Sequence, residues 1–283
     1  IIPKNAFKDG TTLKEISIPD SVTDIRNSAF EGCTSLVKIV IPESVNEIGY
    51  NAFKGCSKLK EISIDSISEI GNSVFDGCTS LEIFSISSSV TSIGDSAFNE
   101  CTSIKSIKIP SSVNSIGKYA FAKCSSLQDI QFESHESIDK INDFLFSECT
   151  SLRKLILPLS IKKIENSAFR GCSSLQEISI PESVRNIENS AFEGCTSLSK
   201  IVLASTNITI GNNAFLGVIN IELEGNISKI PNNMFKGCTS LTQISIPESV
   251  KKISESCFEG CSSLSLLQNN STITKIDKNA FKG

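Results

Sequence analysis

Apolar and polar positions recur along this chain with a period close to 23 residues. A leucine is followed by isoleucines three and five residues later, and this spacing starts at Leu36, Leu59, Leu175 and Leu241. A phenylalanine marks the same register at positions 7, 30, 53, 75, 98, 121, 146, 169, 192, 215, 235, 258 and 281. Periods of about 20 to 30 residues are the signature of a solenoid, in which each repeat stacks on the next.

Each repeat carries the pattern of one short strand followed by turns. Ile39 and Ile41 are separated by one exposed position, as in a half-buried strand. Proline, which lacks the donor that a central strand needs, often follows directly, at positions 19, 42, 110, 158, 181 and 247. The next apolar residues return to the interior at Val45, Ile48, Ala52 and Phe53. Gly49 is expected to permit a bend, and Gly55-Cys56 closes the coil.

The pattern predicts a leucine-rich repeat solenoid with a parallel β-sheet on the concave side, short strands or turns on the convex side, and little helix. No composition break interrupts the phase, so residues 1–283 are expected to form a single solenoid of about 12 coils. Solenoids need polar terminal repeats, and neither end of this sequence has one. We therefore expect a fragment of a longer array.

Composition narrows the function classes. The net charge of −4 argues against a general nucleic-acid binder, whose domain is usually basic. No run of 18 apolar residues occurs, so no membrane-spanning segment is expected. His135 is the sole histidine and lies in an insertion between Glu133 and Glu136, where an exposed loop residue is the simpler interpretation. We expect neither an enzyme nor a cofactor.

The repeat as a whole points to one family. The pattern Leu-x-x-Ile-x-Ile-Pro-x-Ser-Val-x-x-Ile-x-x-x-Ala-Phe-x-x-Cys resembles the BspA-type leucine-rich repeat over essentially all 283 residues. The resemblance implies a surface-exposed or secreted protein of a bacterium or a parasitic protist. It also implies attachment to host cells and matrix proteins, and it supplies no catalytic residues.

Three coils depart from the pattern. The segment 64–67 omits one residue and its proline, the segment 133–137 adds two residues, and the segment 215–218 lacks part of the closing turn. Such edits are expected to change the solenoid locally, and insertions in solenoids often lie on one face.

A hydroxyl position recurs in the turn after the main strand. It is serine at 21, 44, 183 and 249, and by alignment at 89, 112 and 160, and it becomes Thr206, Asn226 and Thr272 later. Because serine hydroxyls bond to nearby backbone, we predict a ladder that joins the turns of adjacent coils.

Cysteine is abundant and regularly placed. Ten of the eleven cysteines lie three residues after the phenylalanine, and Cys257 directly precedes Phe258. None forms the close pairs that a tetrahedral zinc site needs. Neighbouring ladder cysteines would lie within disulfide range, but their side chains should point the same way. Buried thiols that behave as small hydrophobes are the favoured interpretation, although it conflicts with an oxidising location.

The two residues before the isoleucine of each convex-side strand give a charge gradient. Stacking would align these pairs, Ile208-Thr209 among them, into a ridge that is acidic at first and basic later. The basic candidates for ligand binding are Lys140, Lys162, Lys163, Arg185, Lys229, Lys251 and Lys252. Such a ridge would attract sulfated glycans, acidic proteins or anionic surfaces. Because Glu165 and Glu188 are close by, an ordinary solvated face is the favoured interpretation.

The outward side of the main sheet is the second candidate surface. Its residues include Glu15 and Ser17, Lys38 and Val40, Glu61 and Ser63, Lys154 and Ile156, Glu177 and Ser179, and Lys200 and Val202. Aromatic anchors of the kind that dominate interfaces are missing. Binding here should therefore be weak per contact, with the number of repeats supplying avidity.

Glycosylation sequons occur late in the chain, at Asn207, Asn226, Asn269 and Asn270. Alignment assigns the first three to buried positions, so only Asn270 is expected to accept a glycan.

The favoured function is non-catalytic binding of a protein or glycan, with extracellular matrix as a candidate ligand, at a cell surface or after secretion. One alternative is a cytoplasmic protein–protein interaction scaffold, which free thiols would suit better. Another is a structural spacer without a ligand. The oligomeric state is left open.

Overall fold

The computed structural model describes residues 1–134, 136–269 and 272–283 and forms a parallel β-solenoid of about 11 turns. Short β-strands joined by turns make up the described residues, and no helix occurs among them. The solenoid predicted from the repeat is therefore confirmed. The chain divides into two compact units, Ile1–Ile138 and Asp139–Gly283, called unit 1 and unit 2 below. That all 283 residues form a single solenoid domain stays a prediction.

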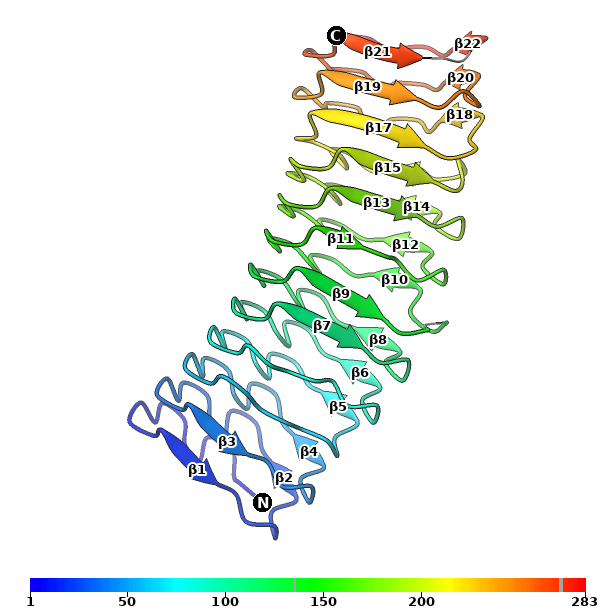
Figure 1. Cartoon of the computed structure of the whole chain (residues 1–283). Helices are drawn as coiled ribbons and strands as arrows, with labels where there is room; N and C mark the ends of the chain where they lie inside the picture. Colours follow the sequence, from blue (N-terminus) through cyan, green and yellow to red (C-terminus); the bar gives the residue numbers. More distant parts are fainter. Residues whose placement is uncertain (135, 270–271) are drawn as a thin grey trace. The chain divides into compact units, whose positions relative to one another are not determined.

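The strands called main strands, which have two to five residues, lie side by side on one face of each unit (Figure 1). In unit 1 they are β1 (Glu15–Ser17), β3 (Lys38–Val40), β7 (Ser106–Ile109) and β9 (Asp129–Phe132). In unit 2 they are β11 (Lys154–Leu155), β13 (Glu177–Ile180), β15 (Lys200–Leu203), β17 (Asn220–Glu224), β19 (Gln243–Ile246) and β21 (Leu266–Asn269). All main-strand pairs are parallel, and β7, β13 and β19 end directly before a proline, as predicted.

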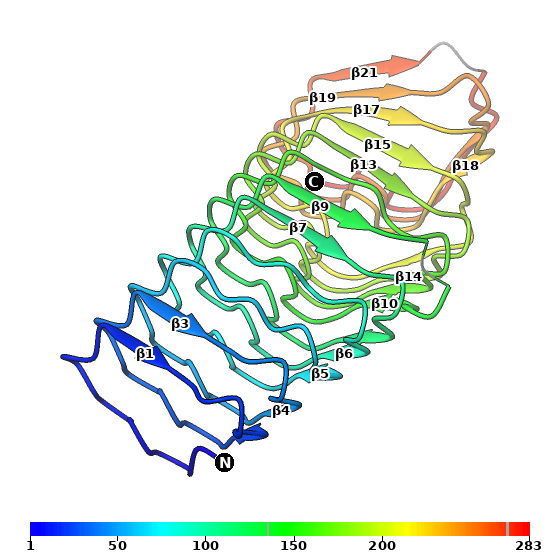
Figure 2. The ribbon, with the colours of Figure 1, turned by 60° about the horizontal axis from the view of Figure 1, so that its bottom comes forward.

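Two-residue strands occupy the other side of the coils, as Figure 2 shows. In unit 1 these short strands are β2 (Asp24–Ile25), β4 (Glu47–Ile48), β5 (Glu69–Ile70), β6 (Ser92–Ile93) and β8 (Ser115–Ile116). In unit 2 they are β10 (Lys140–Ile141), β12 (Lys163–Ile164), β14 (Asn186–Ile187), β16 (Thr209–Ile210), β18 (Lys229–Ile230), β20 (Lys252–Ile253) and β22 (Lys275–Ile276).

The phenylalanines of the repeat stack along the core of each unit. Rings of successive coils have centroids 5.0 to 5.8 Å apart, and the eleven from Phe30 to Phe258 are fully buried. Leucines and isoleucines of the main strands pack beside them, because alternate strand residues point inward. A single coil has no partner for these faces, so stacking is what buries them.

Two turn positions in each coil adopt left-handed backbone. Two residues before the phenylalanine, serine or asparagine usually has φ between 52 and 59°, as at Ser28 and Asn51. Two residues after it, glycine often has φ above 70°, as at Gly32. This geometry points alternate backbone N–H groups at the next coil, where Ser28, Phe30 and Gly32 donate hydrogen bonds of 2.8 to 2.9 Å. The turn region is thereby bonded coil to coil without being a strand.

The glycine position before this turn has a different role from the predicted bend. Gly49 and Gly94 have no left-handed φ. A Cβ added at Gly94 would instead lie 2.6 Å from the backbone nitrogen of Asn72 in the preceding coil. Glycine is needed there because adjacent coils approach closely.

Candidate functional site

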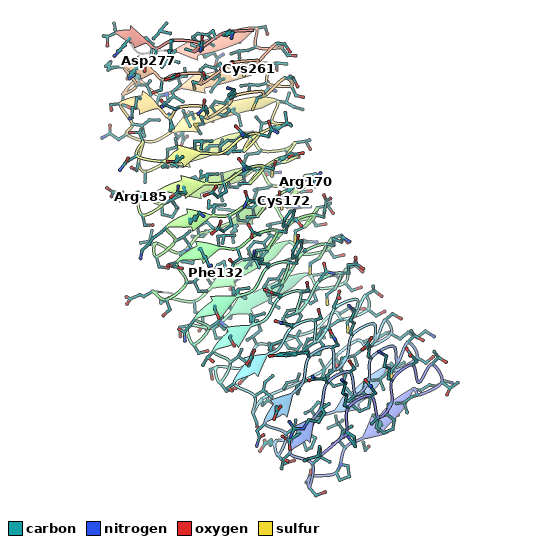
Figure 3. The ribbon with its side chains drawn as sticks, turned by 180° about the vertical axis from the view of Figure 1, so that it is seen from behind. Phe132, Arg170, Cys172, Arg185, Cys261 and Asp277 are labelled. Carbon is teal, nitrogen blue, oxygen red and sulfur yellow. The ribbon has the colours of Figure 1, made fainter. Side chains whose placement is uncertain are left out.

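The predicted basic positions lie in register along the short strands of unit 2. Lys140 faces Lys163 across the β10–β12 pair. Lys252 faces Lys229 on one side and Lys275 on the other. These are separate ladders, because β16 and β18 belong to different sheets. Arg185 lies at the edge of unit 2 opposite to Cys172, so the ridge and the cysteine ladder are on different sides (Figure 3).

Several ridge cations are paired within the protein. Lys163 Nζ contacts Glu165 at 2.9 Å and Glu188 at 3.1 Å, and the hydrogen bonds to these carboxylates raise the pKa of Lys163. Lys252 Nζ contacts Asp277 at 2.6 Å and is the largest cause of the lowered pKa of that carboxyl group. These pairs reduce the positive potential that the ridge presents to a ligand.

The other ridge cations are not held by carboxylates. The Arg185 guanidinium donates to the backbone carbonyl of Glu182, and Lys251 Nζ donates to that of Glu248. Lys140, Lys162 and Lys229 are exposed and have no ion-pair partner among the residues that the structure describes. These three lysines are the part of the ridge that is available to an anion.

Two predictions about the segment before β16 are wrong. Ile208 is buried rather than exposed, with 8% of its surface accessible, and Asn207 is exposed rather than buried. The coil shifts by one residue so that the aliphatic side chain enters the core, because a buried amide without partners is costly. Asn226, also expected inside, is exposed as well.

The outward face of the main strands in unit 2 alternates in charge. Lys154, Glu177 and Lys200 lie in register, and Lys200 Nζ contacts Glu224 at 2.8 Å. Beside this row, Ile156 is 73% exposed, and Leu159 in the following turn is 82% exposed. The face thus combines a charged row with an aliphatic protrusion.

The cysteine ladder faces inward. All eleven cysteines are free thiols, and all except the partly exposed Cys261 are buried. Cys56 Sγ donates to the carbonyl oxygen of Phe30 in the preceding coil at 3.2 Å, and the same contact recurs from Cys33 to Cys261. Burial raises the pKa of Cys124 and Cys195 to about 12. Such thiols are poor nucleophiles, because the thiolate is the reactive form.

The predicted hydroxyl ladder is confirmed. Ser44, Ser112 and Ser183 each donate to a backbone carbonyl one coil earlier, at 2.6 to 2.7 Å. Sequence reasoning missed a second ladder beside the short strands, in which Asn or Asp accepts a hydrogen bond from a backbone N–H of the next coil. It occurs at Asn27, Asn72, Asp95, Asp143 and Asn189. The recurring Asn or Asp after the glycine position was its signal.

Three predictions concern residues or side chains that the structure does not describe. His135 and Asn270 lie outside the described residues, as does the side chain of Asn269.

Among the described residues, no three His, Cys, Asp or Glu side chains gather closely enough to hold a metal ion. The same residues include no helix with the length and apolarity needed to cross a membrane.

Comparison with known proteins identifies the family of this repeat. The model of the BspA type leucine-rich repeat region matches residues 1–128, 93–222 and 216–283. The chain belongs to the BspA-type leucine-rich repeat family. A solved leucine-rich repeat protein from Bacteroides ovatus is 31% identical, with a TM-score of 0.67 over 95% of this chain and 84% of that chain.

Two further bacterial structures resemble this BspA-type chain. One, from Eubacterium ventriosum, is 22% identical over 98% of this chain and 84% of that chain, with a TM-score of 0.55. The other is a leucine rich cell surface protein from Faecalibacterium prausnitzii, 27% identical over 92% of this chain and 80% of that chain, with a TM-score of 0.48. No curated protein matches the sequence.

Proposed function

We propose that this BspA-type chain is a non-catalytic protein-binding scaffold that attaches a cell surface to host or matrix proteins. The observation that carries the proposal is that each coil has two distinct sets of polar side chains, one bonded between coils and one exposed. Hydroxyls, amides and thiols are used in coil-to-coil ladders, whereas the outward side chains of the main strands are directed at solvent. A repeated, rigid and outward-facing row suits a broad protein partner.

The main-strand face of unit 2 is the surface that we assign to this partner. Ile156 and Leu159 are large, exposed and adjacent to the row of Lys154, Glu177 and Lys200. Exposed apolar residues rimmed by charges are typical of protein-binding patches. The charged row would set orientation, and the aliphatic pair would supply buried area.

Free thiols are compatible with a location outside the cell. Disulfide formation and oxidation proceed through the thiolate, and burial holds the thiol pKa far above ambient pH. The conflict between an oxidising location and unpaired cysteines is therefore removed by burial in the ladder.

The proposal is tested by labelling intact cells that express the protein, followed by binding of the purified chain to immobilised fibronectin, laminin and collagen. We expect surface labelling and binding that weakens when Ile156 and Leu159 are both replaced by serine. The double variant Ser106→Ala and Ser115→Ala, at exposed positions in unit 1, is the control. Labelling only after permeabilisation would favour a cytoplasmic scaffold, and surface labelling without binding would favour a spacer.

The basic ridge is a second candidate surface. The three unpaired lysines, Lys140, Lys162 and Lys229, favour contact with a sulfated glycan or another polyanion. Such a contact would add to main-strand binding without competing for the same residues.

A further inference from the structure

One pair of coils in unit 1 does not stack like its neighbours. β4 pairs with β2, and β5 pairs with β6, but β4 and β5 belong to different sheets. In the next coil Gly94 N donates to Ile70 O at 2.7 Å and Thr91 N donates to Ser68 O at 2.8 Å. The equivalent bonds one coil earlier, from Gly71 N to Ile48 O and from Ser68 N to Asn46 O, are not formed.

Tyr50 accounts for this break. It takes the ladder position that is Asn27 and Asn72 in the neighbouring coils. Tyr50 N donates to Asn27 Oδ1 at 3.0 Å, but the hydroxyl oxygen of tyrosine lies at the far end of the ring and does not replace the amide oxygen that would accept from the next N–H, that of Asn72. Its ring lies over Gly71 instead, where an added Cβ would be 2.8 Å from the ring carbon Cδ1. The ring thus spaces the two coils apart only beside their short strands, because their turns remain bonded, with Phe53 N donating to Val74 O at 2.9 Å.

The separation leaves a hollow with an unusual lining. Its volume is about 520 Å³, and one wall is the Tyr50 ring, which is 50% exposed. Around it lie backbone groups that lost their ladder partners: the N–H of Ser68 and Gly71 are donors, and the carbonyls of Asn46 and Ile48 are acceptors. Unpaired backbone groups are rare in folded proteins unless water or a ligand satisfies them.

Two cationic and two anionic side chains line the hollow, so its net charge is close to zero. Arg26 donates to both oxygens of Glu47, at 2.9 and 3.0 Å. Lys4 and Glu69 also line the hollow, and neither has an ion-pair partner among the described residues. One free cation and one free anion give little net attraction for a polyanion or a polycation. They do provide directional hydrogen bonds.

We infer that this hollow is a binding site for a neutral saccharide. A sugar hydroxyl both donates and accepts, so adjacent hydroxyls can satisfy the carbonyl of Ile48 and the N–H of Gly71 together. The apolar C–H face of a sugar ring packs on an aromatic face, which Tyr50 presents. The hollow also falls within the range of about 300 to 1,000 Å³ that is typical of small-ligand sites.

The site is distinct from the proposed protein-binding face, which lies in unit 2. Failure of matrix-protein binding would therefore leave this inference standing. Loss of saccharide binding in a Tyr50 variant should likewise leave matrix-protein binding unchanged.

The test uses the whole chain with methyl glycosides of glucose, galactose, mannose and N-acetylglucosamine, and with their β-linked trisaccharides. Because the chain has two tyrosines and no tryptophan, tyrosine fluorescence reports on the site, and calorimetry gives the affinity. We expect at least one of these sugars to bind. Tyr50→Asn should weaken its binding at least tenfold, which corresponds to about 1.4 kcal/mol.

Tyr50→Asn also distinguishes loss of the binding site from misfolding as the cause of weaker sugar binding. Asparagine restores the ladder acceptor for Asn72 N, so the variant should unfold at the same temperature as the parent or higher. Tyr119→Phe changes the other tyrosine and should leave the affinity unchanged. The inference is overturned if no sugar binds at about 10 mM, or if Tyr50→Asn binds as tightly as the parent.

Discussion

The Ser183 hydroxyl donates a hydrogen bond of 2.6 Å to the carbonyl oxygen of Ile161, 22 residues earlier and one coil away. Ser44 and Val22 are related in the same way at 2.7 Å. These turns leave the main strand and enter the short strand, so their carbonyls have no strand partner. The serine ladder supplies one, and it holds the turn of each coil to its neighbour.

Replacing Ser183 by alanine should therefore destabilise unit 2. The Ile161 carbonyl would lose its partner, at a cost of about 1 kcal/mol in the free energy of unfolding. Urea titration followed by circular dichroism measures this as a lower midpoint. Ser179→Ala removes an exposed hydroxyl of β13 and should change the midpoint little. Equal effects of the two variants would contradict the ladder.

Gly194 provides a test of the left-handed turn. Its φ is 76°, and an added Cβ would meet the backbone of Gly171 at an ordinary 3.5 Å. The cost of Gly194→Ala is therefore conformational rather than steric, about 1 kcal/mol in the free energy of unfolding. Gly194→Asn should cost less, because asparagine tolerates this region better. Thermal or urea unfolding that ranked alanine above asparagine would refute the explanation.

Thiol burial predicts a pH dependence. Unfolded cysteine ionises with a pKa of about 8.5, whereas burial raises the pKa of Cys124 and Cys195 to about 12. The neutral thiols contribute their full stabilisation below the unfolded pKa. Above it, the unfolded state releases protons that the folded state retains, so stability falls as pH rises toward 12.

Urea midpoints at pH values from about 8 to 10.5, an interval of about 2.5 units, measure that slope. Each buried thiol adds up to about 1.4 kcal/mol per pH unit, so Cys195→Ala should flatten the slope by that amount. A thiol reagent at neutral pH should label the native protein slowly and the denatured protein fully. Rapid labelling of the native protein would show that the ladder is accessible.

The basic ridge predicts a difference between two sets of lysines. Replacing Lys140, Lys162 and Lys229 by alanine should lower the salt concentration at which the protein leaves a heparin column. Lys38, Lys60 and Lys154 are exposed and lie on or beside the main-strand side, so their triple alanine variant makes the same change in net charge as a control. Equal shifts would mean that net charge alone decides retention, and the ridge would be rejected.

Much of the fold followed from the sequence because one coil is repeated. The strand ends at proline, the stacked phenylalanines, the inward cysteines and the serine ladder are each set by a residue type that returns at the same position. The left-handed turns were less visible, because Ser28 or Ser190 is compatible with several backbone conformations. Only the frequent asparagine at that position, as at Asn51 and Asn213, indicated them.

In the irregular coils, counting residues from the regular repeat does not predict which side chains are buried. Asn207 was expected to be buried and is exposed, whereas Ile208 was expected to be exposed and is buried. The chain shifts here so that the isoleucine enters the core. The hollow at Tyr50 depends on how far two coils separate. That distance is set by a ring packed on Gly71, 21 residues away, and no local pattern encodes it.

Each ladder described above joins one position of the repeat to a fixed position of the adjoining coil, as Cys56 is joined to Phe30. A whole coil can therefore be duplicated or lost without leaving a donor, an acceptor or an aromatic ring unmatched at the new junction. Gain or loss of a single residue must instead be absorbed between the ladders, as in the coil that omits one residue at 64–67 and still stacks Phe53 on Phe75 with ring centroids 5.7 Å apart. The gene can thus change length in steps of one repeat while the protein remains foldable at each step.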